Sequence, residues 1–416
     1  MEFTTCYCPH SQCTHYGQRG FGAHLVRCGA DRGIPRLLCT MCQGTFSVRQ
    51  GTAYFGVRAE ESNYTTAMRA LGEGNSLRGT GRIVDVDKDT ICDWVDRAGR
   101  HCRAVTTYLF DTLHITECQV DELWSFVRKK EAHLTAAEKV LALYGDAWVW
   151  IAFAPEWRLV AAFVVGKRDQ EHANVLLERL QAVSCGYMPF FTSDQLPHYA
   201  HALLHVYGTP EIILHIPGKR GRKPTPKRLP PTDLHYAQVF KHRKSGHVVE
   251  VTTKIIFGAA AAVQARLAAS VVSQMINTSF VERNNLTCRQ CNGRLSRKVL
   301  SFSKDLTWLE KHLWLSLAYY HFVLPHDSLS QRLSAPQPTR GSGSPKKWQP
   351  VTPAMAAGLT DHVWTMEELL SYRVPPGFRD RLDQQAINHT SSPCHPRYRG
   401  TPPHILTGQV AGKTSS

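Results

Sequence analysis

Three adjacent strand-like segments in the middle of the chain constrain the fold more than any other feature of the sequence. The first spans residues 115–127, and two apolar runs follow within residues 146–165. These runs are separated by Pro155, Glu156 and Trp157, a break that is typical of a hairpin turn. Because consecutive strands usually lie side by side, we expect the three segments to be neighbours in one sheet.

The pattern after these strands alternates between helix and strand. Apolar residues recur at helical spacing within 167–183, a short strand follows at 188–194, and a second helical pattern covers 196–208. A basic, proline-rich stretch and a further strand pair, at about 209–258, are interpreted as an insertion before the chain returns to helix. This order predicts an α/β domain over 115–325, with a mixed sheet flanked by helices.

Residues 1–50 are expected to form a small metal-held module, because they are rich in cysteine and poor in periodic apolar pattern. Cys8 and Cys13 enclose four residues, and Cys39 and Cys42 enclose two. Such pairs can place four thiolates around one tetrahedral Zn²⁺, which would fold the segment without leaving a position for chemistry. Simple burial of the cysteines is the alternative. The competing ligands are Cys6, His10, His15 and Cys28.

Residues 60–103 are expected to form three short helices arranged as a helix-turn-helix DNA-binding domain. Ser76 and Asp87 are placed to cap the second and third helices. Apolar residues of the third helix recur at i, i+3, i+4 and i+7 and should pack inward: Ile91, Trp94, Val95 and Ala98. Lys88 and Arg97 are then left, with Asp89 and Asp93, to face solvent or a DNA groove. The same pattern also fits an ordinary three-helix packing unit.

Asp121, Asp194 and Glu282 are candidate ligands of catalytic metal ions. A two-metal nuclease needs about three carboxylates, because Mg²⁺ prefers oxygen ligands and two ions must flank the scissile phosphate. Asp121 lies in the first strand, and Asp194 ends the later strand, where it could instead cap the next helix. Glu282 opens a helix on which Asn285 and Arg289 share its face, although a polar stripe can also be plain solvated surface.

Two neighbouring groups are not expected to bind the metal ions. Side chains alternate along a strand, so Glu122 should point away from a site that contains Asp121. His198, His201 and His205 recur at helical spacing after the fourth strand. We interpret these histidines as helix surface and DNA contacts.

The net charge favours a polyanionic partner. Lys and Arg outnumber Asp and Glu by 49 to 34, a net charge of +15, and nucleic acid is the expected polyanion. A basic, proline-rich stretch is expected to contact the DNA backbone unless it is only a solvated loop. Its cationic residues are Lys219, Arg220, Arg222, Lys223, Lys227 and Arg228.

Three further features of the sequence concern the cellular location of the protein, the state of its cysteines and the structure of residues 330–416. The sequence has no apolar run long enough to span a membrane and no signal-peptide pattern, so a cytoplasmic protein without membrane contact is expected. Its thirteen cysteines are therefore expected to be buried or metal-bound rather than paired in disulfides. Residues 330–416 are expected to be mostly irregular, apart from a short helix at 365–370.

Taken together, these segments resemble the transposases of the insertion-sequence-one family, from the metal-held module, which corresponds to a zinc knuckle, to about residue 370. The stretches that carry the resemblance are, in order, EGNSLRGTGRIVDVDKDTICDWV, VDELWSFV, YGDAWVWIAF, TSDQLPHYAHALLHVYG, INTSFVERNNLTCRQCNGRLSRKVLSFSK and TPAMAAGLTDHVWTMEELL. The chain departs from the family pattern at Asp85, where a glycine is commoner, and in the wider spacing of its first cysteine pair.

The resemblance implies a ribonuclease-H-like fold that carries a DDE triad of Asp121, Asp194 and Glu282, with Arg289 as the basic residue seven places later. It also implies two catalytic Mg²⁺ ions, terminal inverted repeats and target DNA as substrates, and a homo-oligomer assembled on DNA. DNA strand cleavage and strand transfer is the expected activity. The alternatives are a zinc-containing DNA-binding regulator that has lost its chemistry, and a repair or resolving nuclease on the same fold.

Overall fold

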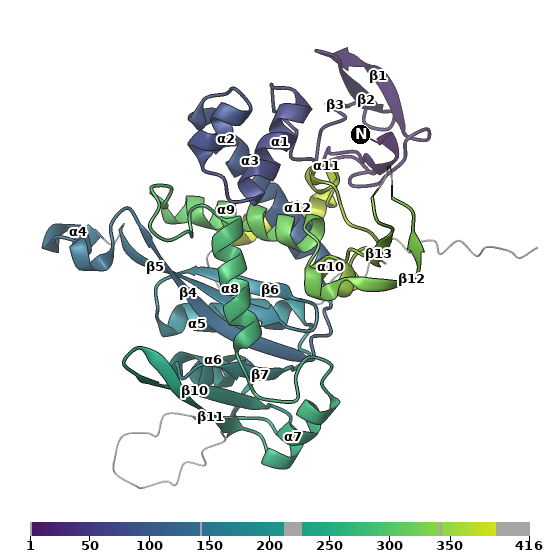
Figure 1. Cartoon of the computed structure of the whole chain (residues 1–416). Helices are drawn as coiled ribbons and strands as arrows, with labels where there is room; N and C mark the ends of the chain where they lie inside the picture. Colours follow the sequence, from purple (N-terminus) through teal and green to yellow (C-terminus); the bar gives the residue numbers. More distant parts are fainter. Residues whose placement is uncertain (1, 142–143, 212–226, 340, 342, 388–416) are drawn as a thin grey trace, which may run out of the picture.

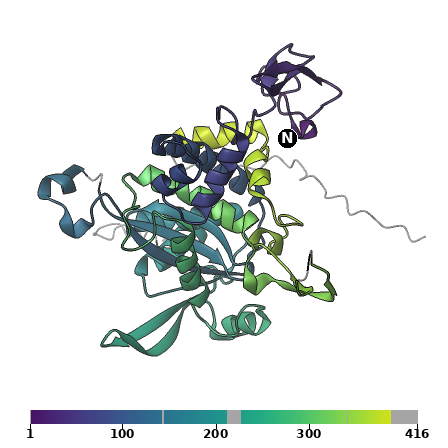
Figure 2. The same cartoon turned by 45° about the horizontal axis from the view of Figure 1, so that its top comes forward.

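The computed structural model describes residues 2–141, 144–211, 227–339, 341 and 343–387. A six-stranded mixed sheet flanked by helices forms the centre of the protein, and a cysteine-rich N-terminal module lies at one end (Figures 1 and 2). Among the described helices, none is both long and apolar enough to cross a membrane.

The N-terminal module is built on a small antiparallel sheet in which the second strand pairs with the other two. Its elements are η1 (Phe3–Thr5), β1 (Leu25–Asp31), β2 (Ile34–Cys39) and β3 (Thr45–Ser47). The buried apolar residues of this module include Leu25, Leu37 and Phe46. A core of this size needs a crosslink such as a bound metal to be stable.

Three helices follow the module: α1 (Glu61–Gly72), α2 (Leu77–Ile83) and α3 (Lys88–Leu109). The caps predicted from the sequence are confirmed. The Ser76 hydroxyl accepts the N–H of Gly79 at 3.0 Å, and the Asp87 carboxylate accepts the N–H of Asp89 at 2.7 Å. Between α2 and α3, Asp85 has a left-handed backbone with φ of 56°, which explains why glycine suits this position.

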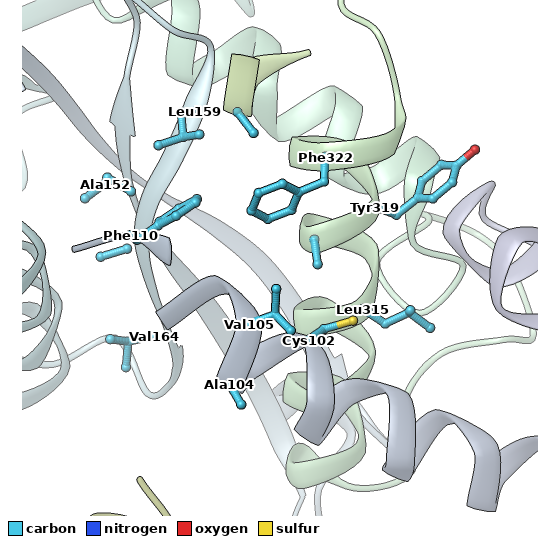
Figure 3. Close-up of a cluster of buried hydrophobic side chains, with 14 of the residues drawn as sticks. Cys102, Ala104, Val105, Phe110, Ala152, Leu159, Val164, Leu315, Tyr319 and Phe322 are labelled. Atoms are coloured by element: carbon cyan, nitrogen blue, oxygen red, sulfur yellow. The ribbon is translucent and has the colours of Figure 1, made fainter. Parts of the chain in front are cut away.

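Helix α3 is longer than the predicted element, because it continues past residue 103 to Leu109. The four residues that were expected to face inward, Ile91, Trp94, Val95 and Ala98, are all buried. At Gly99 the helix passes close to α9 (Leu306–Ala318), since an added Cβ would lie 2.5 Å from the carbonyl oxygen of Lys311. Figure 3 shows the core that α3 and α9 share, with Val105 and Phe322 among its members.

The central sheet has the strand order β11-β10-β7-β4-β5-β6. Its strands are β4 (Glu117–Val127), β5 (Gly145–Ala154), β6 (Leu159–Gly166), β7 (Phe190–Ser193), β10 (Tyr236–Lys244) and β11 (His247–Phe257). β4, β5 and β6 pair antiparallel in sequence order, so the predicted set of three neighbouring strands is confirmed. β7 pairs parallel with β4 on one side and with β10 on the other.

The place of β10 in the sheet differs from the expectation that about 209–258 is an insertion. Tyr236 of β10 pairs with Phe191 of β7, and the Tyr236 side chain is fully buried. The strand pair is therefore an integral edge of the sheet. Between the two short paired strands β8 (Thr209–Pro210) and β9 (Arg228–Leu229), residues 212–226 lie outside the described part of the chain.

Helices cover both faces of the sheet. α5 (Gln170–Val183) and α6 (Pro197–Tyr207) pack on one face, and α8 (Ser279–Cys291) and α9 pack on the other. The buried sides of β4 and β5 alternate accordingly, since Val120 and Trp150 belong to one core and Leu123 and Ile151 to the other. The remaining elements of this region are η2 (Glu131–His133), α4 (Ala136–Leu141) and α7 (Ala260–Ala269).

Up to residue 387, the segment after α9 contains more helices and strands than the irregular tail predicted for 330–416, and residues 388–416 lie outside the described part of the chain. Its elements are η3 (Tyr319–Val323), η4 (Asp327–Leu329), β12 (Gln331–Gln337), β13 (Lys346–Gln349), α10 (Pro353–Ala356), α11 (Met366–Ser371) and α12 (Pro376–Ile387). Buried Arg373 donates to the carbonyl oxygen of Val48, and His101 of α3 lies 3.0 Å from the carbonyl oxygen of Leu369. These contacts tie the segment to the N-terminal module and to α3.

Candidate metal-binding sites

The first candidate site lies where β4 continues past the end of β7. The last parallel pair between these strands joins Gln119 to Thr192. Asp121 and Asp194 each lie two residues beyond that pair, which places them side by side at the point where the sheet opens. The carboxylates of Asp121, Glu122 and Asp194 each offer an oxygen within 4.8 Å of the other two.

Asp121 is held by helix α8. Its Oδ2 accepts a hydrogen bond of 2.7 Å from the side-chain amide of Asn285, and its Oδ1 accepts the N–H of Glu122 at 2.9 Å. Burial, and then the neighbouring negative charge of Glu122, raise the pKa of Asp121 to about 7. A divalent cation at this position would remove the cost of that buried negative charge.

Asp194 takes part in the turn that leads into α6. Its Oδ1 accepts the N–H of Leu196 at 2.9 Å, and α6 begins at Pro197. Asp194 thus stabilises the turn before α6 and also belongs to the carboxylate group, but it does not cap the helix, whose N-cap residue Leu196 has no side-chain cap. A carboxylate can do both, because each oxygen has two lone pairs.

Glu122 lies closer to Asp121 and Asp194 than the alternation of side chains along a strand predicted. Its side chain does leave β4 on the face opposite to Asp121, where Tyr199 of α6 donates to it at 2.8 Å and Arg168 forms an ion pair with it. Its carboxylate nevertheless lies within the same group as Asp121 and Asp194. Burial, followed by the charge of Asp194, raises the pKa of Glu122.

Glu282 lies in the first turn of α8 and is not a member of the carboxylate group found among the described residues. Its carboxylate forms an ion pair with Lys241 of β10 and accepts a hydrogen bond of 2.6 Å from the Thr278 hydroxyl. The predicted convergence of three carboxylates is thus met by Asp121 and Asp194, whereas Glu282 is engaged with a lysine.

Arg289 lies on the same side of α8 as Asn285 and also contacts β4. Its guanidinium donates to the carbonyl oxygens of Trp124 and Leu295, both at 2.8 Å. Burial, and then the charge of Arg297, lower the pKa of Arg289 to about 10. Asn285 and Arg289 therefore face β4, whereas the Glu282 side chain pairs with Lys241 and remains 44% exposed.

The second candidate site is a group of four cysteines in the N-terminal module. The sulfur atoms of Cys8, Cys13, Cys39 and Cys42 all lie within 4.8 Å of one another, and two of the sulfur pairs are 3.8 Å apart. A tetrahedron with metal–sulfur distances of about 2.3 Å has edges of about 3.8 Å, so the group fits Zn²⁺. The group could hold a zinc ion, as the spacing of the cysteines predicts.

The competing zinc ligands are distributed differently. Nδ1 of His10 lies 3.3 Å from the sulfur of Cys42, next to the group. His15 instead contacts Gln18, and Cys28 is exposed on β1. Burial raises the pKa of the Cys6 thiol, which lies outside the four-cysteine group.

The residues expected to contact DNA occupy varied positions. Lys88 is exposed but pairs with Asp89, and the guanidinium of Arg97 donates to the carbonyl oxygen of Phe55 at 2.9 Å. Lys227 and Arg228 are exposed, the first directly before β9 and the second at its start. The other four basic residues of that stretch, Lys219, Arg220, Arg222 and Lys223, lie outside the described residues.

The three histidines of α6 do not gather into a metal site among the described residues. His205 contacts Glu178 at 3.1 Å, and His198 lies near Trp150.

No protein-family model matches the chain, and no curated protein matches it significantly.

Sequence reasoning missed the contribution of Glu122 and of the residues that surround the carboxylates. Arg168, Tyr199 and Lys241 come from other elements, and no local pattern links them to Asp121. The position of Asn285, three residues after Glu282 on the same helix face, was the one signal that pointed to its contact with the site.

Proposed function

We propose that the protein is a DNA transposase that cuts and joins the ends of a mobile element by metal-dependent phosphodiester transfer. The observation that carries the proposal is the parallel register of β4 and β7, which brings Asp121 and Asp194 together at the open end of the sheet. Paired carboxylates at such a position are the oxygen ligands that Mg²⁺ prefers. In this proposal they act with Glu282 as the DDE triad.

The carboxylates of Asp121, Asp194 and Glu282 are oxygen ligands of the kind that a pair of Mg²⁺ ions requires. Asp121 is half-buried, and burial and the neighbouring charge of Glu122 raise its pKa, so a bound cation would favour its ionised form. When bound, Mg²⁺ would supply the activation of a water or 3′-hydroxyl nucleophile and the stabilisation of the leaving oxygen. Asn285 fixes the orientation of the Asp121 carboxylate, and Arg289 holds α8 against β4.

The strand order supports a ribonuclease-H-like fold, which is part of this proposal. Three antiparallel strands are followed by a parallel strand, with Asp121 on the first strand and Asp194 directly after the fourth. The capped helices α2 and α3 and the cysteine module support a helix-turn-helix and zinc-knuckle front end that binds the terminal repeats. The net charge of +15 suits such a partner.

The test is an assay on supercoiled DNA that carries the sequences flanking the gene. We expect strand cleavage that requires Mg²⁺ and products in which the element's 3′ ends are joined to new DNA. Cleavage without joining would indicate a repair or resolving nuclease instead. The proposed enzyme would be contradicted by a protein that binds the element's ends but neither cleaves nor joins them.

The Lys241–Glu282 ion pair favours a second candidate, a DNA-binding regulator that has lost its chemistry. A carboxylate already paired with a lysine has less affinity for a divalent cation, because the lysine competes for the same charge. The two candidates differ in one measurable property: a regulator binds the terminal repeats with the same affinity in the presence and absence of Mg²⁺, and leaves them intact.

A further inference from the structure

Beside the carboxylate group, β4 and the turn after α8 enclose a cavity of about 280 Å³. Its cationic lining residues are Lys130, Arg289, Arg294, Arg297 and Lys298. No acidic residue is among those that line it. A pocket with this balance of charge selects an anion.

One of these cations is buried without full compensation. Arg294 is only 8% exposed, and its Nε has no hydrogen-bond partner among the described residues. Its Nη1 reaches the Ser303 hydroxyl at 3.4 Å. That Nε is closed to solvent, so a ligand in the cavity would contact other atoms of Arg294, and phosphate is the anion that the fork of a guanidinium matches best.

The cavity also has an aromatic side. Trp124 and Phe126 line it, with ring centres 5.8 Å apart, and the ammonium group of Lys130 lies 5.6 Å from the centre of the Trp124 ring. Aromatic rings beside cationic groups are the usual surface for the bases and phosphates of single-stranded nucleic acid. The lining therefore suits a nucleotide better than a small inorganic anion.

The cavity adjoins the carboxylate group through a repeated contact between β4 and α8. Asn285 reaches Asp121, and Arg289, one helical turn later, reaches the backbone of Trp124. A DNA strand that passes over Asp121 can thus continue along β4 into the cavity.

We propose that this cavity binds one nucleotide of the DNA strand next to the reacting phosphate, with its phosphate on Arg294, Arg297 and Lys298 and its base against Trp124 and Phe126. The proposal deepens the proposed function and rests on it for the identity of the strand. Arg289 acts here as a support, because it joins the two walls through the carbonyl oxygens of Trp124 and Leu295.

The test uses the full chain without added divalent metal, so that binding is measured apart from cleavage. The probe is a thymidine trinucleotide with a 5′-phosphate, titrated calorimetrically. Exposed Arg297 and Lys298 are changed together to Gln, which spares the core, and the matched control changes exposed Lys346 and Lys347 of β13 to Gln. We expect affinity to fall about tenfold for the Arg297/Lys298 pair and to stay unchanged for the control.

Two further arms separate phosphate from base recognition. A trinucleotide with neutral methylphosphonate linkages and no 5′-phosphate should bind far more weakly than the charged one. Phe126→Leu should weaken the trinucleotide but leave the affinity for inorganic phosphate unchanged. Equal binding by the Arg297/Lys298 variant, or equal binding of the neutral trinucleotide, overturns the pocket, and equal trinucleotide binding by Phe126→Leu overturns its base-binding side.

The outcome is independent of the proposed catalysis. Normal pocket binding by a protein that never cleaves DNA contradicts the proposed function alone. Normal cleavage of DNA by a protein whose cavity binds no trinucleotide contradicts the pocket alone.

Discussion

The side-chain amide of Asn285 donates a hydrogen bond of 2.7 Å to Oδ2 of Asp121 and so joins helix α8 to the central strand of the sheet. This bond and the N–H of Glu122, which donates to Oδ1, fix the orientation of the Asp121 carboxylate. Residues that orient a metal ligand in this way typically contribute about 10–100-fold to metal affinity or activity.

Asn285→Ala should therefore slow DNA cleavage by about 10–100-fold and raise the Mg²⁺ concentration needed for half-maximal rate. Gln290→Ala, at an exposed position on the same helix, is the matched control and should behave as the wild type. The measurement is the single-turnover rate across a Mg²⁺ titration. An Asn285→Ala variant with an unchanged Mg²⁺ dependence contradicts the positioning role.

Glu122 and Glu282 compete for the role of third metal ligand. Glu122 lies in the carboxylate group but forms an ion pair with Arg168 and accepts a hydrogen bond from Tyr199, whereas Glu282 forms an ion pair with Lys241. We expect Glu282→Gln to reduce cleavage by roughly a thousandfold and Glu122→Gln to have a milder effect, with DNA binding intact in both. The reverse order of effects assigns the third ligand to Glu122.

The raised pKa of Asp121 makes the stability of the metal-free protein depend on pH. The pKa of Asp121 is about 7 in the folded protein and 3.8 ordinarily. At a pH between these two values, the folded state therefore holds more protons than the unfolded state. The free energy of unfolding should thus fall by on the order of a few kcal/mol as pH rises from about 4 to about 7. Asp121→Asn should remove this contribution.

Urea unfolding of the wild type and Asp121→Asn at several pH values checks the prediction. Added Mg²⁺ should stabilise the wild type more at pH 8 than at pH 5, because the ion binds the ionised carboxylate. Parallel pH profiles for the two proteins, with no effect of Mg²⁺, would show that Asp121 is not responsible.

The four-cysteine group should carry one zinc ion per chain. Cys39→Ser removes a buried ligand and should abolish zinc binding, unfold the N-terminal module and weaken binding to the terminal repeats. Cys28→Ser, at an exposed position outside the group, should retain the metal. Elemental analysis of the purified proteins decides the matter, and full zinc content in Cys39→Ser would exclude the assigned ligand set.

Local pattern was enough to predict several parts of this structure. The antiparallel strands β4 to β6 follow from apolar runs separated by a turn, and the caps at Ser76 and Asp87 follow from side chains placed before helices. The four cysteines also follow from spacing, because a metal site needs only two chelating pairs that a loop can bring together.

Long-range pairing explains what the sequence did not disclose. β10 pairs with β7 although about forty residues separate them, and nothing local distinguishes that pairing from an insertion. The Lys241–Glu282 ion pair is a consequence of the same sheet edge. Alternation along β4 predicted the face on which Glu122 lies, but not that its flexible carboxylate reaches back toward Asp194.

The most direct test of the central claim is metal rescue at Asp194. A thiolate is a poor ligand for Mg²⁺ and a better one for softer Mn²⁺, so the metal requirement reports direct ligation. Cleavage of element-end DNA is measured for Asp194→Cys and Asp194→Asn with each metal, after confirming that both variants bind DNA. The proposal predicts that Asp194→Cys is inactive with Mg²⁺ and regains activity with Mn²⁺, while Asp194→Asn stays inactive with both. Full activity of either variant with Mg²⁺ would contradict it.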